Sequence, residues 1–154
     1  MKPILYVEDD SNDVLFFEHA VKKTGLSQPV QVACDGKDAM DYLKGTAAFA
    51  NREKFPLPCL VLLDLKSQRV TGLEVLKWIR QESGLPLVVV VLTASGHNAD
   101  VTAAYRLGAN AYLIKPTDAR EFERMIKALI DFWLIYNTGP QESETKPRFT
   151  PASA

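Results

Sequence analysis

The chain has 154 residues, of which 47% are hydrophobic, which suits one domain with a sizeable core. Its formal net charge is −1 and its Lys and Arg residues are scattered, whereas a nucleic-acid-binding domain usually carries a basic patch. No apolar run reaches the roughly 20 residues that cross a membrane, and the start becomes acidic too early for a signal peptide. We therefore expect a cytoplasmic protein that binds neither nucleic acid nor membrane.

The sequence alternates short apolar runs with amphipathic stretches. The apolar runs predict strands over Ile4–Val7, Val30–Cys34, Leu60–Asp64, Leu87–Leu92 and Ala111–Ile114. The amphipathic stretches predict helices over Ser11–Lys23, Gly36–Leu43, Gly72–Glu82, Asn98–Leu107, and from a cap at Thr117 or Asp118 to Tyr136. Residues 45–58 are longer than the usual connection and predict an added loop or helical turn.

Five strands alternating with five helices predict an α/β fold, a doubly wound parallel sheet with right-handed crossovers. Two cysteines, Cys34 and Cys59, fall in stretches expected to be strands, and their spacing matches neither zinc ligation nor a disulfide framework. We expect both to be small buried residues in a reducing compartment.

Polar residues follow four of the predicted strands. They are Glu8 and Asp9 after the first, Asp64 after the third, Thr93 after the fourth and Lys115 after the fifth. Because the carboxyl ends of parallel strands share one rim, and ligands of open α/β sheets bind there, these side chains are expected to converge. A polar rim facing solvent is the alternative reading for any one of them.

Converging carboxylates repel one another, and a hard divalent cation relieves that repulsion. Mg²⁺ prefers a site with one or two carboxylates and a phosphate to complete its ligands. With such a cation, Asp64 is a candidate nucleophile toward phosphorus, forming an aspartyl phosphate. The Lys115 ammonium and the Thr93 hydroxyl are candidates to stabilise the phosphoryl oxygens.

Four stretches in this order carry a resemblance to a known family. They are Ile4–Asp10, Leu60–Asp64 followed by Gly72, Val91–Ser95 and Leu107–Pro116. With them, the chain resembles a response regulator receiver domain of two-component phosphorelay signalling. The resemblance implies the flavodoxin-like strand order 2-1-3-4-5, a receiver domain over residues 1–137 and a switch protein that catalyses only its own phosphorylation and dephosphorylation. Residues 138–154, rich in Pro, Ser, Thr and Glu, are expected to be a disordered tail.

The resemblance also implies roles at the acceptor and the metal. Asp64 matches the phosphoacceptor, Asp9 the direct Mg²⁺ ligand, and Glu8 the acidic partner that reaches the metal through water. Lys66 would offer its backbone carbonyl to the metal. Glu8 departs from the more frequent Asp but keeps the charge. The basic stretch Lys66–Thr71, without the proline many receivers carry four residues after the acceptor, puts in doubt the matching kinase and the phosphate lifetime.

Further roles follow from the same resemblance. Thr93 and Lys115 match the hydroxyl and ammonium that hold the phosphoryl group, and Thr93 with Tyr112 matches the switch pair of the family. The Lys115–Pro116 bond is expected to be cis.

The resemblance narrows to a subfamily. Residues 45–58 and the segment Asp131–Leu134 are similar to the small single-domain regulators that partner phytochrome-type histidine kinases. The expected partner is therefore a histidine kinase of that type, and other single-domain receivers are the alternative.

The last predicted helix is apolar around most of its circumference. One stripe suits the sheet: Phe122, Met125, Ile126, Leu129 and Trp133. Four apolar residues fall outside it: Ile130, Leu134, Ile135 and Tyr136. Because monomers rarely expose a large apolar patch, we expect a homodimer through the fourth helix, fifth strand and fifth helix. The alternative is a last turn that folds back on its own domain.

Three other functions compete with the phosphoacceptor. A magnesium-dependent phosphatase of the haloacid dehalogenase class carries D-x-D, but Lys66 stands two places after Asp64. A flavodoxin-like electron carrier needs a Ser-, Thr- and Gly-rich phosphate loop after the first strand, where this chain has acidic residues. A pseudo-receiver would keep the fold without the chemistry, yet all the expected site residues are present.

Overall fold

The computed structural model describes residues 1–66 and 69–139. Its strands are β1 (Ile4–Val7), β2 (Val30–Ala33), β3 (Leu60–Leu63), β4 (Val89–Thr93) and β5 (Ala111–Ile114). Its helices are α1 (Ser11–Lys23), α2 (Gly36–Lys44), α3 (Gly72–Trp78), α4 (Asn98–Arg106) and α5 (Ala119–Ile130). Three shorter segments are the 3₁₀ turn η1 (Ala47–Phe49) and the π-helical turns η2 (Ile79–Ser83) and η3 (Asp131–Tyr136), which extend α3 and α5.

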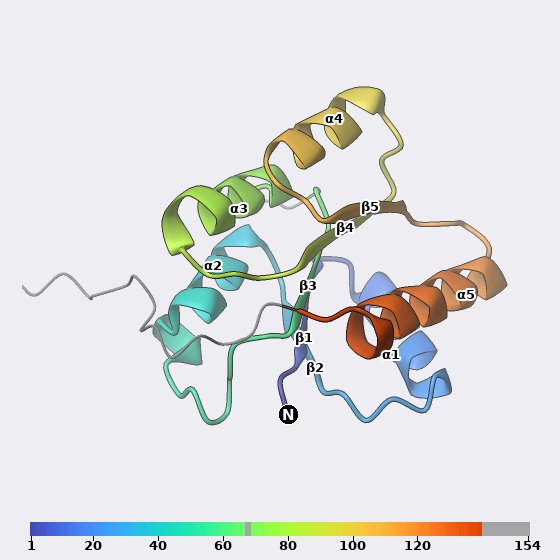
Figure 1. Cartoon of the computed structure of the whole chain (residues 1–154), viewed down its shortest axis with the longest axis horizontal. Helices are drawn as coiled ribbons and strands as arrows, with labels where there is room; N and C mark the ends of the chain where they lie inside the picture. The colour runs from blue at the N-terminus through green and yellow to red at the C-terminus, as the bar shows by residue number, and fades with distance from the viewer. Residues whose placement is uncertain (67–68, 140–154) are drawn as a thin grey trace, which may run out of the picture.

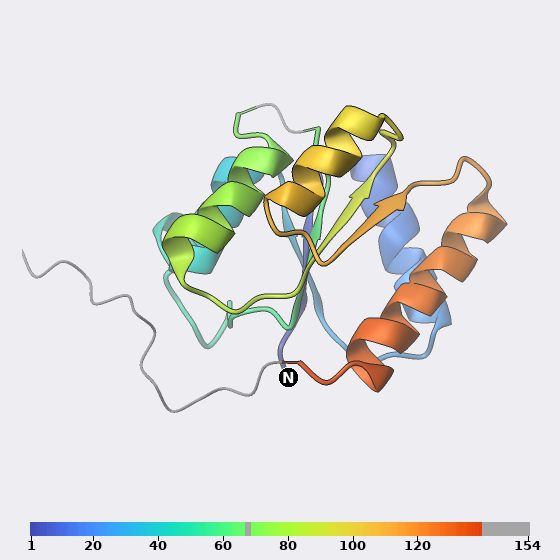
Figure 2. The ribbon, with the colours of Figure 1, turned by 45° about the horizontal axis from the view of Figure 1, so that its top comes forward.

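The strands form one parallel sheet in the order β2-β1-β3-β4-β5, so the predicted flavodoxin-like topology is confirmed. Helices α2, α3 and α4 cover one face of the sheet, and α1 and α5 cover the other (Figures 1 and 2). Val7 pairs with Leu63, and Leu63 pairs with Val91. This register brings the carboxyl ends of the central strands level at one rim.

The sheet residues divide between two cores because successive side chains of a strand point to opposite faces. Leu5, Val61, Leu63 and Val91 lie in the core beneath α2, α3 and α4. Residues of the other parity, together with α1 and α5, form the second core, which holds Ile4, Tyr6, Phe17, Leu60, Leu62, Val90, Leu92 and Ile126. Burial on both faces explains why β1, β3 and β4 are continuous apolar runs.

The α5 helix has a second partner within its own domain. Ile130, which the helical stripe had placed outside the core, is buried with Phe17 and Val21 of α1. The correction has a simple cause: α1 packs beside α5 on the same face of the sheet (Figure 2), so a wider arc of α5 is covered. Phe132, Ile135 and Tyr136 remain exposed on η3.

The predicted insertion between α2 and β3 does contain a helical turn, η1, and it is held by one arginine. Arg52 donates to the carbonyls of Tyr42 and Leu43 at the end of α2, at 2.7 and 2.5 Å, and to the carbonyl of Phe55 at 3.2 Å. The rings of Tyr42, Phe49 and Phe55 pack against one another. The arginine thus supplies donors to carbonyls in the last turn of α2, where the regular helical hydrogen bonds end, and the Tyr42 carbonyl also accepts from the Gly45 N–H at 3.1 Å.

Three local predictions were wrong. Cys34 is exposed and Cys59 is half-buried. Neither lies within a strand, because β2 ends at Ala33, one residue before Cys34, and β3 begins at Leu60, one residue after Cys59. The Lys115–Pro116 bond is trans. Trans is the lower-energy form of an X–Pro bond by about 0.5–1 kcal/mol.

None of the helices in the described part of the chain has the length and apolar character needed to cross a bilayer. The predicted disordered tail, 138–154, lies outside the described residues from position 140 onward.

Candidate functional site

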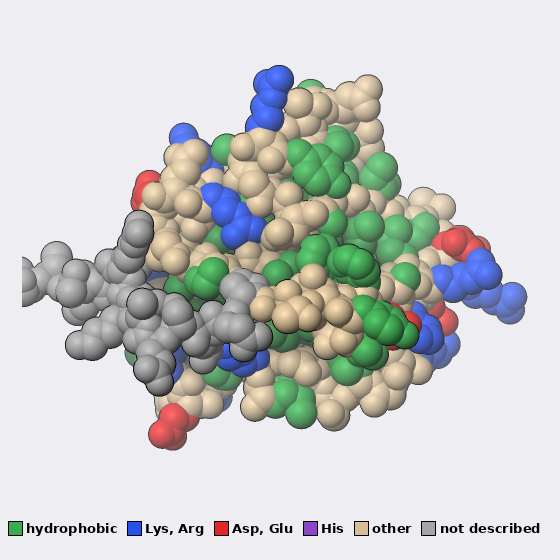
Figure 3. Space-filling model, in the orientation of Figure 1, with side chains coloured by type: hydrophobic (Ala, Val, Ile, Leu, Met, Phe, Trp, Pro, Cys, Tyr) green, Lys and Arg blue, Asp and Glu red, His purple; other side chains and the backbone are tan. Residues whose placement is uncertain are grey.

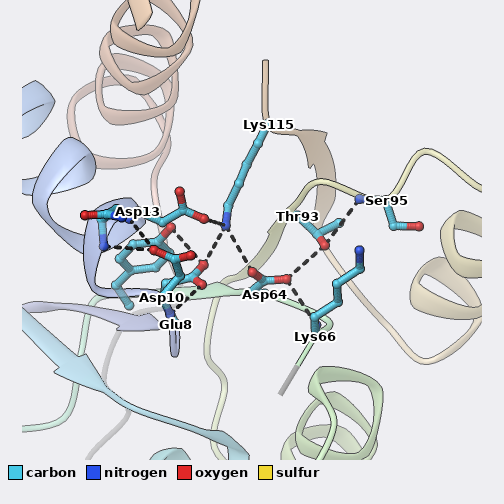
Figure 4. A network of polar contacts seen from close by, with 10 residues as sticks. Glu8, Asp10, Asp13, Asp64, Lys66, Thr93, Ser95 and Lys115 are labelled. Atoms are coloured by element: carbon cyan, nitrogen blue, oxygen red, sulfur yellow. Dashed lines mark hydrogen bonds and ion pairs between the residues drawn. The ribbon is translucent and has the colours of Figure 1, made fainter. Parts of the chain in front are cut away.

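The polar residues predicted to converge do so around Asp64 (Figure 4). Asp64 directly follows β3, the central strand, and is 6% exposed. Thr93 is the last residue of β4, and Glu8 and Lys115 directly follow β1 and β5. The parallel register therefore places four side chains from four strands on one rim.

Both carboxylate oxygens of Asp64 accept hydrogen bonds. The Thr93 hydroxyl donates to Oδ1 at 2.9 Å, and the backbone N–H of Lys66 donates to the same oxygen at 3.1 Å. The Lys115 ammonium donates to Oδ2 at 3.0 Å. Asp64 is therefore fixed in orientation, with a hydroxyl and an ammonium on opposite oxygens.

Lys115 contacts three carboxylates at once. Its Nζ lies 2.5 Å from Glu8 Oε2, 2.9 Å from Asp13 Oδ2 and 3.0 Å from Asp64 Oδ2. The Lys115 side chain is 10% exposed, so these contacts are little screened by water. An ammonium has three N–H donors, and here each finds a different carboxylate.

The acids of the site differ in protonation. Burial and the neighbouring Asp64 raise the pKa of Glu8 to about 7, although Lys115 acts in the opposite direction. Burial also works against ionised Asp64, but hydrogen bonds from Glu8 and the Lys66 backbone, with the charge of Lys115, hold its pKa below the usual value. Burial disfavours the charged form of Lys115 as well, yet the acidic groups around it raise its pKa overall. Asp64 is therefore a carboxylate of the site that stays ionised at neutral pH.

Comparisons with known proteins decide the family. Residues 4–127 match the response regulator receiver domain. The response regulator Rcp1 of Synechocystis sp. is 35% identical over 140 residues, which cover 90% of this chain and 93% of Rcp1. The chain belongs to the response regulator receiver family. The predicted receiver fold is thereby confirmed.

Solved structures of receiver domains are similar to this chain in fold. The Mn²⁺-bound form of Rcp1 has a TM-score of 0.83 at 34% identity, over 92% of this chain and 100% of that one. The phosphorylated cyanobacterial phytochrome response regulator RcpA has a TM-score of 0.84 at 32% identity, over 91% and 99%. The bacteriophytochrome response regulator AtBRR has a TM-score of 0.71 at 40% identity, over 90% and 99%. The resemblance to phytochrome-type regulators is confirmed.

The donor set of this receiver fits a hard divalent cation. Carboxylate oxygens of Glu8, Asp13 and Asp64 lie within 4.8 Å of one another. Oxygen ligands in such number suit Mg²⁺, which keeps several waters besides. Asp9 lies exposed in the connection from β1 to α1 and is not in this group. Its role as a direct ligand, like that of the Lys66 carbonyl, stays a prediction.

Sequence reasoning missed Asp13. It lies in the first turn of α1, which Asp10 caps by accepting from the backbone N–H groups of Asn12 and Asp13 at 2.8 and 3.1 Å. An acidic residue in a first turn usually complements the helix dipole, so its type gave no signal. Its position five residues after Glu8, which directly follows β1, was the available hint.

Tyr112, the predicted switch residue, lies half-buried on β5. Its hydroxyl donates to the carbonyl of Ser95 at 2.7 Å, in the connection that follows Thr93. The Ser95 hydroxyl in turn donates to Asp100 of α4 at 2.5 Å. The backbone N–H of Ser95 donates to the Thr93 hydroxyl at 3.5 Å, so Tyr112 and Thr93 both hydrogen bond to Ser95 in the β4–α4 connection.

Proposed function

We propose that this receiver accepts a phosphoryl group on Asp64 from the phosphohistidine of a histidine kinase. The single observation that supports this best is a buried, ionised Asp64 with Thr93 on one oxygen and Lys115 on the other. An Asp64 oxygen attacks phosphorus, the N–P bond breaks, and its electron pair returns to the imidazole. The similarity to phosphorylated RcpA supports the same chemistry.

Each residue has a task in this transfer. The Lys115 ammonium and the Thr93 hydroxyl stabilise charge on the phosphoryl oxygens. Glu8 and Asp64 are the carboxylates we assign to Mg²⁺, with Asp9 and the Lys66 carbonyl completing its protein ligands. Mg²⁺ neutralises negative charge on the phosphoryl oxygens when bound. The similarity to Mn²⁺-bound Rcp1 supports a divalent cation here.

Incubation with acetyl phosphate and Mg²⁺ tests the acceptor. Wild-type protein should gain one phosphoryl mass that hydroxylamine removes, and Asp64→Asn should gain none. Asp41→Asn is a matched control, because Asp41 is an acid of α2 that pairs with Lys37 and has no hydrogen bond or ion pair to the acceptor in the described structure. A label that persists in Asp64→Asn would place the phosphoryl group elsewhere.

We infer a phytochrome-type histidine kinase as the phosphoryl donor. The similarity to RcpA and AtBRR supports this partner. Leu15 and Phe16 of α1 are 63% and 57% exposed close to the acceptor rim, and they suit contact with a helical partner. A Leu15→Ala, Phe16→Ala variant should lose phosphoryl transfer from such a kinase and keep the acetyl phosphate reaction. Loss of both reactions would contradict a docking role.

We also propose a homodimer through α4, β5 and α5. Apolar side chains gather over β5 and the end of α5 in Figure 3, and Tyr105, Ile114, Ile135 and Tyr136 are all at least 47% exposed. Monomeric proteins rarely leave a large apolar area of this kind exposed, so it suits an interface with a second copy. Sedimentation at tens of micromolar should show a dimer that Ile135→Asp dissociates. A monomer with and without beryllofluoride would contradict it.

A further inference from the structure

We propose that Asp13 is a positioning residue for phosphoryl transfer, acting through Lys115; the inference rests on the function proposed above. The observation is the ion pair between Asp13 Oδ2 and Lys115 Nζ, at 2.9 Å, across two elements distant in sequence. Asp13 touches neither the acceptor nor its hydroxyl partner through any hydrogen bond described for it. Its effect therefore passes through the ammonium (Figure 4).

Lys115 has no donor to spare in the resting state. Its three N–H groups face Glu8, Asp13 and Asp64, one each. A phosphoryl group on Asp64 offers new oxygen acceptors on the side where Lys115 now meets Oδ2. The ammonium can turn to them only by exchanging that bond, so the other two contacts decide where Nζ stays.

Of those two contacts, the one with Glu8 is the less durable. Glu8 is the carboxylate we assign to the divalent cation, and a cation draws its negative charge away from the ammonium. Asp13 is 39% exposed and comes from α1, whose first turn is fixed by the Asp10 cap. Asp13 belongs to the same oxygen cluster, but we assign it to the ammonium and not to the cation, so its contact is the one that persists when metal and phosphoryl group are both present. It holds the ammonium within reach of the phosphoryl oxygens.

A double-mutant cycle tests this role. The measurement is the second-order rate constant of phosphorylation by acetyl phosphate at saturating Mg²⁺, followed by the hydroxylamine-sensitive mass. Asp13→Asn should lower it about fivefold in the wild type, in line with the coupling of contacting charged residues. In a Lys115→Met background the same substitution should change it less than about twofold. The rate constant can be measured even if the protein binds acetyl phosphate too weakly for a binding titration.

Glu18→Gln is the matched control, since Glu18 is a half-buried acid of the same helix without an ion pair in the described structure. It should leave the rate constant unchanged, and thermal unfolding should show all variants folded. An equal effect of Asp13→Asn in both backgrounds would make Asp13 a metal ligand or a structural residue, and no effect would remove any role. Both outcomes overturn the inference. A wild type that takes no phosphoryl group overturns the proposed function instead.

Discussion

Two half-buried cations of this receiver, Lys115 and Arg80, are held in opposite ways. Lys115 meets three carboxylates, each of which carries or can carry a charge. Arg80 of η2 instead donates to the backbone carbonyls of Gly108 and Leu87 at 2.9 and 2.7 Å and to the Asn110 side chain at 2.7 Å. The partners of Lys115 are carboxylates, which the divalent cation and the phosphoryl group proposed above would compete for or displace. The partners of Arg80 are neutral dipoles that neither would affect.

The difference separates the functional rim from the scaffold. At the carboxyl ends of the strands, a single ammonium is shared among like charges, and any added cation redistributes its contacts. At the other end, Arg80 joins the turn after α3 to the connection before β5, and Asn110 extends that link to the start of β4 through Val89 N–H. Binding events should alter the first cation and leave the second unchanged.

Lys115→Met should have the largest effect on stability. In a chelator it leaves buried carboxylates without their cation, and breaking a buried ion pair costs about 3 kcal/mol or more. Mg²⁺ should restore much of the loss, because it binds the folded site and supplies the missing positive charge. Thermal unfolding with EDTA and with Mg²⁺ measures both. Lys23→Met, which removes the exposed pair with Glu123, should show neither effect. A loss of thermal stability in Lys115→Met that Mg²⁺ does not reduce would contradict the idea that Lys115 and the metal neutralise the same carboxylates.

Arg80→Met should come second, at about 2 kcal/mol, because it leaves part-buried carbonyls without a donor. The decrease in unfolding free energy should be the same with EDTA and with Mg²⁺, since none of the partners of Arg80 lies at the rim around Asp64. Urea unfolding in the two conditions gives the comparison. Lys77→Met removes an exposed charge from the preceding helix α3 and should be close to neutral. If the stability lost in Arg80→Met differed between EDTA and Mg²⁺, Arg80 would be coupled to the metal site, and the contrast between the two cations would be wrong.

Local patterns predicted much of the fold, and the misses trace to contacts distant in sequence. The bounds of α1 and β5 were predicted as observed, because an amphipathic stretch marks the first and a short apolar run the second. The fourth strand was predicted from Leu87 but begins at Val89. The Leu87 carbonyl accepts a hydrogen bond from Arg80, and the local apolar pattern does not predict that contact.

The site shows the same division. Residues at strand ends, such as Asp64 and Lys115, could be found because parallel topology alone brings them to one rim. Asp13 was missed, since its position on a helix turn by itself predicts only a favourable dipole contact, and its spacing from Glu8 was a weak hint. The cis Lys115–Pro116 bond was carried over from the resemblance alone, and the structure has it trans.

The ion pair of Arg69 with Asp35 provides the smallest test, because it is intermediate between the two cations. Arg69 Nε lies 2.5 Å from Asp35 Oδ2, and the two side chains are 56% and 12% exposed. Burial opposes ionised Asp35, but Arg69 and the backbone N–H of Asp38 hold its pKa below the usual value. A lowered pKa stabilises the folded state above the unfolded pKa of about 4, and that stability is lost as pH falls through the folded pKa.

Asp35→Asn should therefore cost up to about 1 kcal/mol at pH 7, with Asn still able to cap α2. The gap between variant and wild type should narrow as pH falls from 4 to below 3, where the wild-type carboxylate also becomes neutral. Urea unfolding across that range measures the gap, with exposed Glu53→Gln as the control. Because Arg69 keeps Asp38 as a second partner at 3.5 Å, it resembles Lys115 in sharing carboxylates. Its exposure lets water compensate for a lost partner, so added Mg²⁺ should leave this gap unchanged. A gap that stays constant over the whole pH range would mean that Asp35 acts only as a helix cap.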